Sequence, residues 1–155
     1  MIEERIREIV EEIDQISDKF LIYEYLISRG EDLPEIPQEQ RTEQQLVHGC
    51  QSPLWFDWEY VEFQADSKQQ NIGKLVFRAY SESKIVRGIA EIIIYIFQNQ
   101  TPHKIRSSSS EFLYRLGLNG IISSRRIGGL TSLVEQIKEI AYKLDVDFLM
   151  DQCRL

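Results

Sequence analysis

The chemistry available to this chain centres on Cys50, which lies where a loop gives way to a predicted strand. The chain has only two cysteines, and the other, Cys153, lies near the end of the sequence. A single thiol beside Gly49 can act as a nucleophile, whereas a metal clip or a disulfide framework needs several cysteines close together. These residues therefore favour chemistry carried out by one sulfur atom.

A metal centre is disfavoured because the chain has few Cys and His residues that could serve as soft ligands. Structural zinc sites and Fe–S clusters usually take three or four Cys or His ligands, often from CxxC pairs. The sequence offers two cysteines and two histidines, His48 and His103, without such pairing. We therefore expect no bound metal, and we do not expect the chain to be a scaffold for Fe–S clusters.

Three interpretations of Cys50 stay open on spacing alone. A protease-type nucleophile would need a histidine base, and His48 is close in sequence, but Gly49 favours a turn that does not ensure contact between the two side chains. A thiol carrier would need a reactive thiolate on a loop that can enter another protein's active site. An inert core cysteine is equally compatible, because free cysteine is often buried.

Length and composition predict one soluble globular domain over residues 1–155. Hydrophobic residues make up 43% of the chain and charged residues 28%, which is ordinary for such a domain. The acidic start of the sequence differs from a signal peptide, and the longest apolar run, residues 92–97, is too short to cross a bilayer. Free cysteines fit a reducing compartment. We therefore predict a cytoplasmic protein without membrane association.

Negative charge is concentrated in the first part of the chain. The formal net charge is -7: residues 1–45 hold 13 acidic and 5 basic residues, a net charge of -8, and the remaining residues hold 12 acidic and 13 basic residues, a net charge of +1. An acidic chain repels phosphate backbones, so we do not expect nucleic acid as a partner. The adjacent Arg125 and Arg126 belong to the nearly neutral remainder, where they could meet an acidic protein surface.

Helical periodicity dominates the N-terminal part. Isoleucine residues recur on one stripe over residues 2–16, which predicts an amphipathic helix. A second helix is expected over residues 19–29, capped by Ser17 or Asp18. Gly30 is expected to end this helix, because glycine commonly follows the last helical residue.

An extended connector and a hairpin are expected next. Two X-Pro steps favour extended backbone, and the polar residues 41–45 predict a short helical turn. Aromatic and β-branched residues indicate strands over residues 54–63 and 74–79. Residues 64–73, which are mostly polar, are expected to form the hairpin loop.

The rest of the chain is predicted to be helical. We expect helices over residues 83–98, from Pro102 onward, over residues 111–116 and over residues 129–144. The first of these is the most apolar and should be the most buried. Helices, an antiparallel strand pair and further helices define an α+β fold, with a small antiparallel sheet packed against several helices.

Segments on both sides of Cys50 resemble the SufE family of sulfur acceptor proteins. The segment Val47-x-Gly49-Cys50-Gln51-Ser52-x-x-Trp55 is similar to the family's cysteine signature. The other similar segments are, in order, Tyr25-Leu26-Ile27-x-x-Gly30-x-x-Leu33-Pro34, Arg41, Ile85-Val86-x-Gly88, Thr101-Pro102, Leu116-Gly117-Leu118 and Ser124-x-Arg126-x-x-Gly129-Leu130. They span residues 20–140, and their order and spacing strengthen the resemblance.

The resemblance implies a sulfur acceptor with a small SufE/IscU-like α+β fold. In this family a cysteine takes sulfane sulfur from a PLP-dependent cysteine desulfurase, stimulating it, and passes the sulfur on as a persulfide to an Fe–S scaffold. Cys50 matches the acceptor position, and no cofactor is expected on this chain, because the cofactor chemistry belongs to the partner. The residues expected to contact a SufS-like desulfurase are Arg126, Gly49, His48, Gln51 and Glu82.

Two other roles stay open beside sulfur transfer. The protein could activate a desulfurase allosterically, with Cys50 incidental, or it could be a redox sensor in which Cys50 and Cys153 form a reversible bridge. If Cys50 is sheltered in the free protein, sulfur transfer also requires its loop to move outward on docking. Gly49 is the expected pivot, because glycine tolerates unusual backbone angles.

Overall fold

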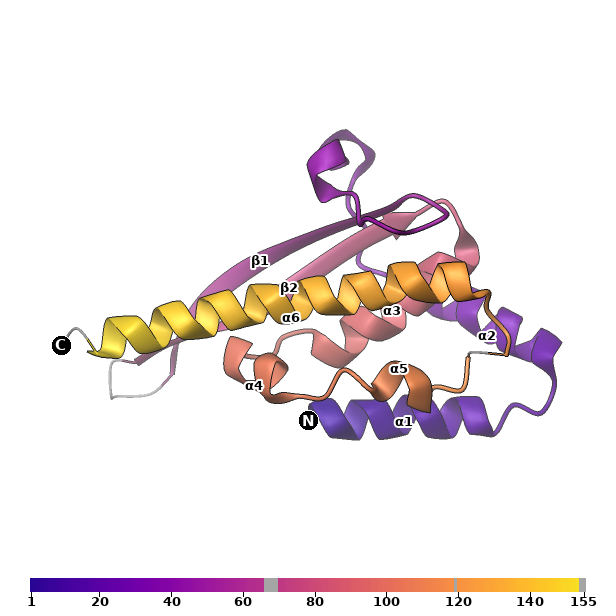
Figure 1. Cartoon of the computed structure of the whole chain (residues 1–155), viewed down its shortest axis with the longest axis horizontal. Coiled ribbons are helices and arrows are strands. Elements are labelled where there is room, and N and C mark those ends of the chain that lie inside the picture. The colour runs from indigo at the N-terminus through magenta and orange to yellow at the C-terminus, as the bar shows by residue number, and fades with distance from the viewer. Residues whose placement is uncertain (66–69, 119, 154–155) are drawn as a thin grey trace.

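The structure is a computed structural model that describes residues 1–65, 70–118 and 120–153. Its elements, in chain order, are α1 (Ile2–Asp14), α2 (Lys19–Glu31), the 3₁₀ turns η1 (Gln38–Gln40) and η2 (Glu43–Gln45), β1 (Leu54–Ala65), β2 (Gln70–Ser81), α3 (Lys84–Phe97), α4 (Pro102–Ser107), α5 (Phe112–Arg115) and α6 (Ser124–Cys153). Within the described residues, α-helices and a two-stranded antiparallel sheet confirm the predicted α+β class (Figure 1).

The sheet is one long hairpin whose strands extend further than predicted. Pairing runs from Leu54 opposite Ser81 to Ala65 opposite Gln70. Part of the predicted loop, residues 64–73, is therefore strand, because the antiparallel ladder joins backbone groups and polar residues extend it as readily as apolar ones. The remaining residues of that loop lie outside the described part of the chain. The start of β1 and the end of β2 thus lie together at one end of the hairpin.

The predicted extended connector lies along the outer edge of β2. The backbone N–H of Ala79 donates to the carbonyl of Pro34 at 2.9 Å, and Glu35 forms a parallel bridge to Ala79. Arg41 then stacks its guanidinium 3.3 Å from the ring centre of Tyr80. After the connector the chain forms η2, which is the short helical turn predicted over residues 41–45, and then continues to the start of β1.

Helix α3 is the centre of the core, as expected for the most apolar of the predicted helices. It packs against β2 on one side and against α1 and α2 on the other (Figure 1). The side-chain amide of Gln98, just after α3, donates to the carbonyl of Phe77 and accepts from its N–H, at 3.1 and 2.7 Å. The end of the central helix is thereby tied to the buried middle of β2.

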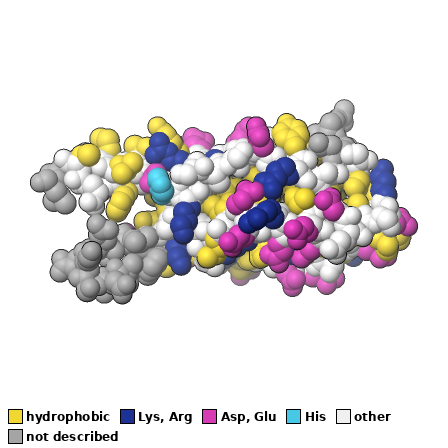
Figure 2. Space-filling view, turned by 90° about the horizontal axis from the view of Figure 1, so that it is seen from below, with side chains coloured by type: hydrophobic (Ala, Val, Ile, Leu, Met, Phe, Trp, Pro, Cys, Tyr) yellow, Lys and Arg dark blue, Asp and Glu magenta, His cyan; other side chains and the backbone are white. Residues whose placement is uncertain are grey.

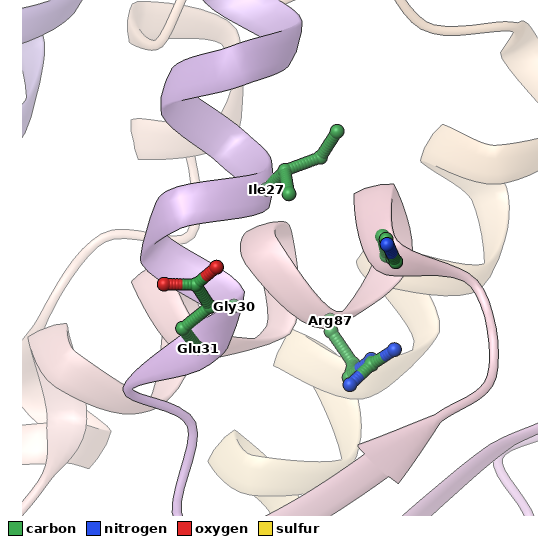
Figure 3. A pocket seen from close by; sticks show the side chains of 5 residues that line it. Ile27, Gly30, Glu31 and Arg87 are labelled. Carbon is green, nitrogen blue, oxygen red and sulfur yellow. The ribbon is translucent and has the colours of Figure 1, made fainter.

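Two glycines allow α2 and α3 to cross closely, and one of them corrects a prediction. Gly30 does not end α2, which continues to Glu31. A Cβ on Gly30 would lie 2.9 Å from the backbone nitrogen of Gly88, and a Cβ on Gly88 would overlap the carbonyl of Leu26. Figure 3 shows this crossing from close by, with Gly30 on α2 facing α3. Gly30 is therefore a packing residue, and Asp32 follows the helix instead.

The predicted cap at Asp18 is confirmed, and two further helices begin with a capping side chain. The side chains of Asp18, Ser83 and Thr101 each accept a hydrogen bond from the first turn of the helix that follows. Gly117 follows α5 with a positive φ of 69°, which suits glycine. None of the helices in the described residues is long and apolar enough to cross a membrane.

Helix α6 is much longer than the predicted helix over residues 129–144. The hydroxyl of Ser123 accepts a hydrogen bond from the N–H of Arg126 at 3.4 Å and so caps the helix well before Gly129, the predicted first residue. At the other end, the first inward position after the apolar stripe is Asp145, a buried carboxylate 3.0 Å from Nη1 of Arg106 on α4. This polar contact carries the helix past the point where hydrophobic periodicity ends.

Replacing Gly88 by alanine should destabilise the protein, because the new methyl group must displace the backbone of α2. Overpacking of this kind costs about 1–3 kcal/mol, more than the roughly 1 kcal/mol that alanine gains over glycine within a helix. Urea unfolding should therefore have a lower midpoint for Gly88→Ala. Gly128→Ala is the matched control, because a Cβ there meets open space; equal midpoints for the two variants would contradict the close crossing.

Candidate functional site

The loop that carries Cys50 is anchored at both ends in the core. The N–H of Val47 donates to the carbonyl of Leu54 at 2.8 Å, and Leu46 forms a bridge to Trp55. Val47 and Leu54 are both buried. The chain therefore leaves and re-enters the core at nearly the same point, and residues 48–53 project from it as a closed loop.

The tip of this loop is a turn at His48 and Gly49, as predicted. Gly49 has a positive φ of 89° and no atom within 4 Å of the position of a Cβ. His48 is exposed, and none of the hydrogen bonds among the described residues joins it to Cys50. The arrangement of a protease-type nucleophile, in which a histidine takes the thiol proton, is therefore not present in this loop.

The side chain of Cys50 rests directly on the backbone of α6. A Cβ on Gly129 would overlap Sγ of Cys50 and would lie 2.8 Å from its Cα. Cys50 is half-buried and packs against the hydrophobic core. The thiol thus points beneath its own loop into a seat that exists only because position 129 lacks a side chain.

Burial controls the protonation of this thiol. It raises the pKa of Cys50 above its ordinary value, and no charged group contributes to the shift. Because the thiolate is the nucleophilic form, the resting site holds Cys50 in its less reactive, protonated state. Burial therefore lowers the fraction of Cys50 that is thiolate at a given pH.

Arg126 lies one helical turn before the seat of Cys50. It stands in the first turn of α6, and its side chain is half-exposed. Among the side chains that the structure describes, none is an ion-pair partner of Arg126. Its guanidinium is therefore available to a carboxylate on another protein, whereas the side chain of the neighbouring Arg125 lies outside the described residues.

The other residues expected to contact a partner lie at the same end of the molecule. Gln51 is exposed beside Cys50. Glu82 is exposed directly after Ser81, which pairs with Leu54 at the base of the loop. Strand pairing and the seat on α6 therefore bring together segments that are far apart in the sequence.

An open hollow of about 480 Å³ adjoins the loop. Its lining residues are Glu43, Leu46, Val47, His48, Gly49, Cys50, Gln51 and Pro53. The lining combines apolar side chains with the polar side chains of Glu43, His48 and Gln51. Gly129 was not among the predicted site residues. The available signal was the pair Gly128-Gly129 next to the apolar residues of a predicted helix.

A second hollow, of about 190 Å³, lies between the end of α2 and the start of α3 (Figure 3). It is lined by Ile27, Gly30, Glu31, Lys84 and Arg87. In Figure 3 the side chains of Glu31 and Arg87 point in different directions, and Arg87 lies 3.9 Å from Glu35. The lining mixes both charges and contains no Cys, Ser or His side chain. Among the described residues, no three His, Cys, Asp or Glu side chains group as a metal site.

The proposed bridge between Cys50 and Cys153 is wrong for a single chain of this fold. Cys153 is the last residue of α6, whereas Cys50 contacts Gly129 near the start of the same helix. At 1.5 Å per residue the two ends of that stretch are about 36 Å apart. A disulfide needs Cα atoms within roughly 7 Å, so an internal redox switch is excluded.

Charges of both signs are interleaved on the face that includes α1. Figure 2 views the molecule from below and shows Lys and Arg side chains next to Asp and Glu. One such pair joins Arg115 of α5 to Glu3 of α1 at 2.6 Å. This face therefore presents mixed charge instead of the continuous basic surface that binds phosphate backbones.

Comparison with known proteins assigns the chain to a family. The SufE family, described by its Fe–S metabolism associated domain, matches residues 7–141. An uncharacterized SufE-like protein of Rhizobium meliloti is 32% identical over 137 residues, which cover 83% of this chain and 94% of the relative. The sulfur acceptor protein CsdE of Escherichia coli is 29% identical over 135 residues, 86% of this chain and 84% of CsdE. The chain belongs to the SufE family.

A solved structure shares the fold. The solution structure of a hypothetical protein from Thermus thermophilus matches with a TM-score of 0.65 at 18% identity, covering 90% of this chain and 94% of the other. At this identity the likeness concerns the fold alone. The resemblance seen in the residues around Cys50 and the α+β fold expected from it are thus both confirmed.

Alkylation of Cys50 should require a higher pH in the folded protein than in the same protein unfolded in urea. Burial raises the pKa of the thiol only in the folded state, and the thiolate is the species that reacts. The rate of reaction with iodoacetamide, measured against pH in a Cys153→Ser background, tests this. A folded-state midpoint equal to or below the unfolded one would show that burial does not govern the thiol.

Proposed function

We propose that this protein is a sulfur acceptor and carrier that works with a PLP-dependent, SufS-like cysteine desulfurase. The observation that carries the proposal is the single half-buried thiol of Cys50 on an anchored loop, in a chain of the SufE family. The carrier passes its sulfur to a scaffold on which Fe–S clusters are assembled. Residues 1–155 act as one SufE-like domain, because buried residues from the first and last helices belong to one core.

The chemical step is an exchange between a thiol and a persulfide. The Cys50 thiolate attacks the outer sulfur of the desulfurase persulfide, and a new S–S bond forms as the old one breaks. The desulfurase thiolate leaves with the electron pair of that bond and takes up a proton equivalent to the one that Cys50 has lost. The sulfane sulfur keeps its oxidation state, so the step needs no oxidant, reductant or cofactor on this chain.

Docking must expose Cys50 before this attack. In the resting state the thiol faces α6, so an attacking geometry requires residues 48–53 to swing away from the helix. Gly49 is suited to be the pivot, because it already has a positive φ and is free of neighbouring atoms. Release of burial also lowers the pKa of Cys50 toward its ordinary value, which raises the thiolate population where the donor is.

The exposed polar residues around the loop are proposed to contact the desulfurase. Arg126 is the main anchor, because its guanidinium is half-exposed and can form a bidentate pair with a carboxylate. The neighbouring contacts are His48, Gly49, Gln51 and Glu82. The cytoplasm is the proposed compartment, because Cys50 and Cys153 are both free thiols, which suits reducing conditions.

Cys50→Ser should abolish sulfur loading of this chain. A hydroxyl does not accept sulfane sulfur, whereas the thiol of Cys153 is remote from the loop and is dispensable. After incubation with desulfurase, PLP and cysteine, intact mass should show one added sulfur atom on the wild type and on Cys153→Ser, and none on Cys50→Ser. If Cys50→Ser still stimulates the desulfurase as strongly as the wild type, the protein is an allosteric activator and the carrier role is wrong.

Arg126→Ala should weaken binding to the desulfurase and leave the fold intact. A hydrogen bond to a charged group contributes about 1.5–3 kcal/mol, so the dissociation constant should rise roughly tenfold or more. Lys143→Ala is the matched control, because it removes the same charge from an exposed position further along α6. Equal affinities for the two variants, measured by calorimetry, would remove Arg126 from the interface.

A further inference from the structure

Two adjacent glycines on α6 differ completely in their surroundings. A Cβ on Gly128 would have no atom within 4 Å, whereas a Cβ on Gly129 would overlap Sγ of Cys50 and lie 2.8 and 3.0 Å from its Cα and Cβ. Glycine inside a helix is unfavourable by about 1 kcal/mol relative to alanine. Position 129 therefore has a specific reason to lack a side chain, and that reason is the acceptor thiol.

We propose that Gly129 is a positioning residue that sets how far Cys50 is withdrawn into the protein, and that any side chain at this position drives the loop outward. The proposal rests on the proposed function only in naming the desulfurase as the partner that normally breaks this contact. The contact that withdraws the acceptor is thus made with the backbone of α6.

The loop, and not the helix, must yield to a side chain at position 129. Gly129 is buried, and the residues that follow it, Leu130 and Leu133, are fixed in the core. Residues 48–53 have mostly exposed side chains and lie between the two anchors of the loop. Movement of a surface loop costs less than displacement of a packed helix, because helix displacement would open the core.

The position of the seat also connects it with the proposed partner contact. Arg126 and Gly129 are three residues apart on α6, so they lie on the same side of the helix, one turn from each other. A partner that binds the guanidinium is therefore next to the contact that retains the thiol.

The experiment compares Gly129→Ala with Gly128→Ala, both in a Cys153→Ser background. The two variants add the same methyl group to adjacent residues of one helix, and only the first collides with Cys50. Iodoacetamide should alkylate Cys50 several-fold faster in Gly129→Ala at neutral pH, and the pH midpoint of the reaction should fall, since each pKa unit changes the thiolate population about tenfold. Gly128→Ala should match the parent in both rate and midpoint.

An unchanged rate and midpoint in Gly129→Ala, or equal changes in both variants, would overturn the proposal. Alkylation needs no desulfurase, so this outcome is distinct from failure of the proposed function, which would appear as absence of sulfur on Cys50 in the parent protein. A merely structural role for Gly129 would alter stability without moving the pH midpoint of the native protein.

A second measurement decides the outcome if Gly129→Ala folds poorly. Cys50→Gly removes both side-chain atoms that the new methyl group meets, so the loss of melting temperature caused by Gly129→Ala should be smaller in that background. A loss of the same size in both backgrounds would mean that the new methyl group does not collide with the side chain of Cys50, and the proposal would be wrong.

Discussion

The contact between Cys50 and the backbone of α6 is the constraint on which the site depends. The thiol reaches this position only because Gly129 has no side chain, and burial there raises its pKa. The loop holds the position because Val47 and Leu54 fix its two ends in the core. The packing of Cys50 is therefore linked to its reactivity, because a change that moves the sulfur atom out of its buried position also lowers the pKa of the thiol.

The part of the fold that supports this contact depends on close packing between helices and not on a large sheet. An isolated two-stranded hairpin is marginal in water, and here β2 gains its support from α3. Gly30 and Gly88 let α2 approach α3 until backbone meets backbone. Because α3 is held between the hairpin and the N-terminal helices, the starts of β1 and α6 converge at one end of the molecule (Figure 1), where Cys50 and Arg126 come together.

Much of the fold could be predicted from local sequence patterns such as helix caps and hydrophobic periodicity. The features that were not predicted depend on contacts between segments far apart in the sequence. The cap at Asp18 could be predicted because its carboxylate accepts a hydrogen bond from the N–H of Phe20, only two residues further along the chain. Gly30 and Gly129 were read as helix boundaries, since glycine is rarely favoured inside helices, but each marks the approach of another segment. Asp145 likewise lies beyond the apolar stripe of α6, and its contacts with Arg106 and His103 on α4 account for its burial.

A thiol with a raised pKa is a poor nucleophile at rest, and this is consistent with a carrier that must react with one donor only. Susceptibility of a cysteine to oxidation follows its thiolate character and exposure, so a permanently exposed Cys50 thiolate would be open to oxidation before it meets its partner. Burial is the sole cause of the raised pKa, and burial ends as soon as the loop leaves α6. In the proposed cycle, activation therefore coincides with docking, and selectivity follows from where the thiol is exposed and not from its intrinsic reactivity.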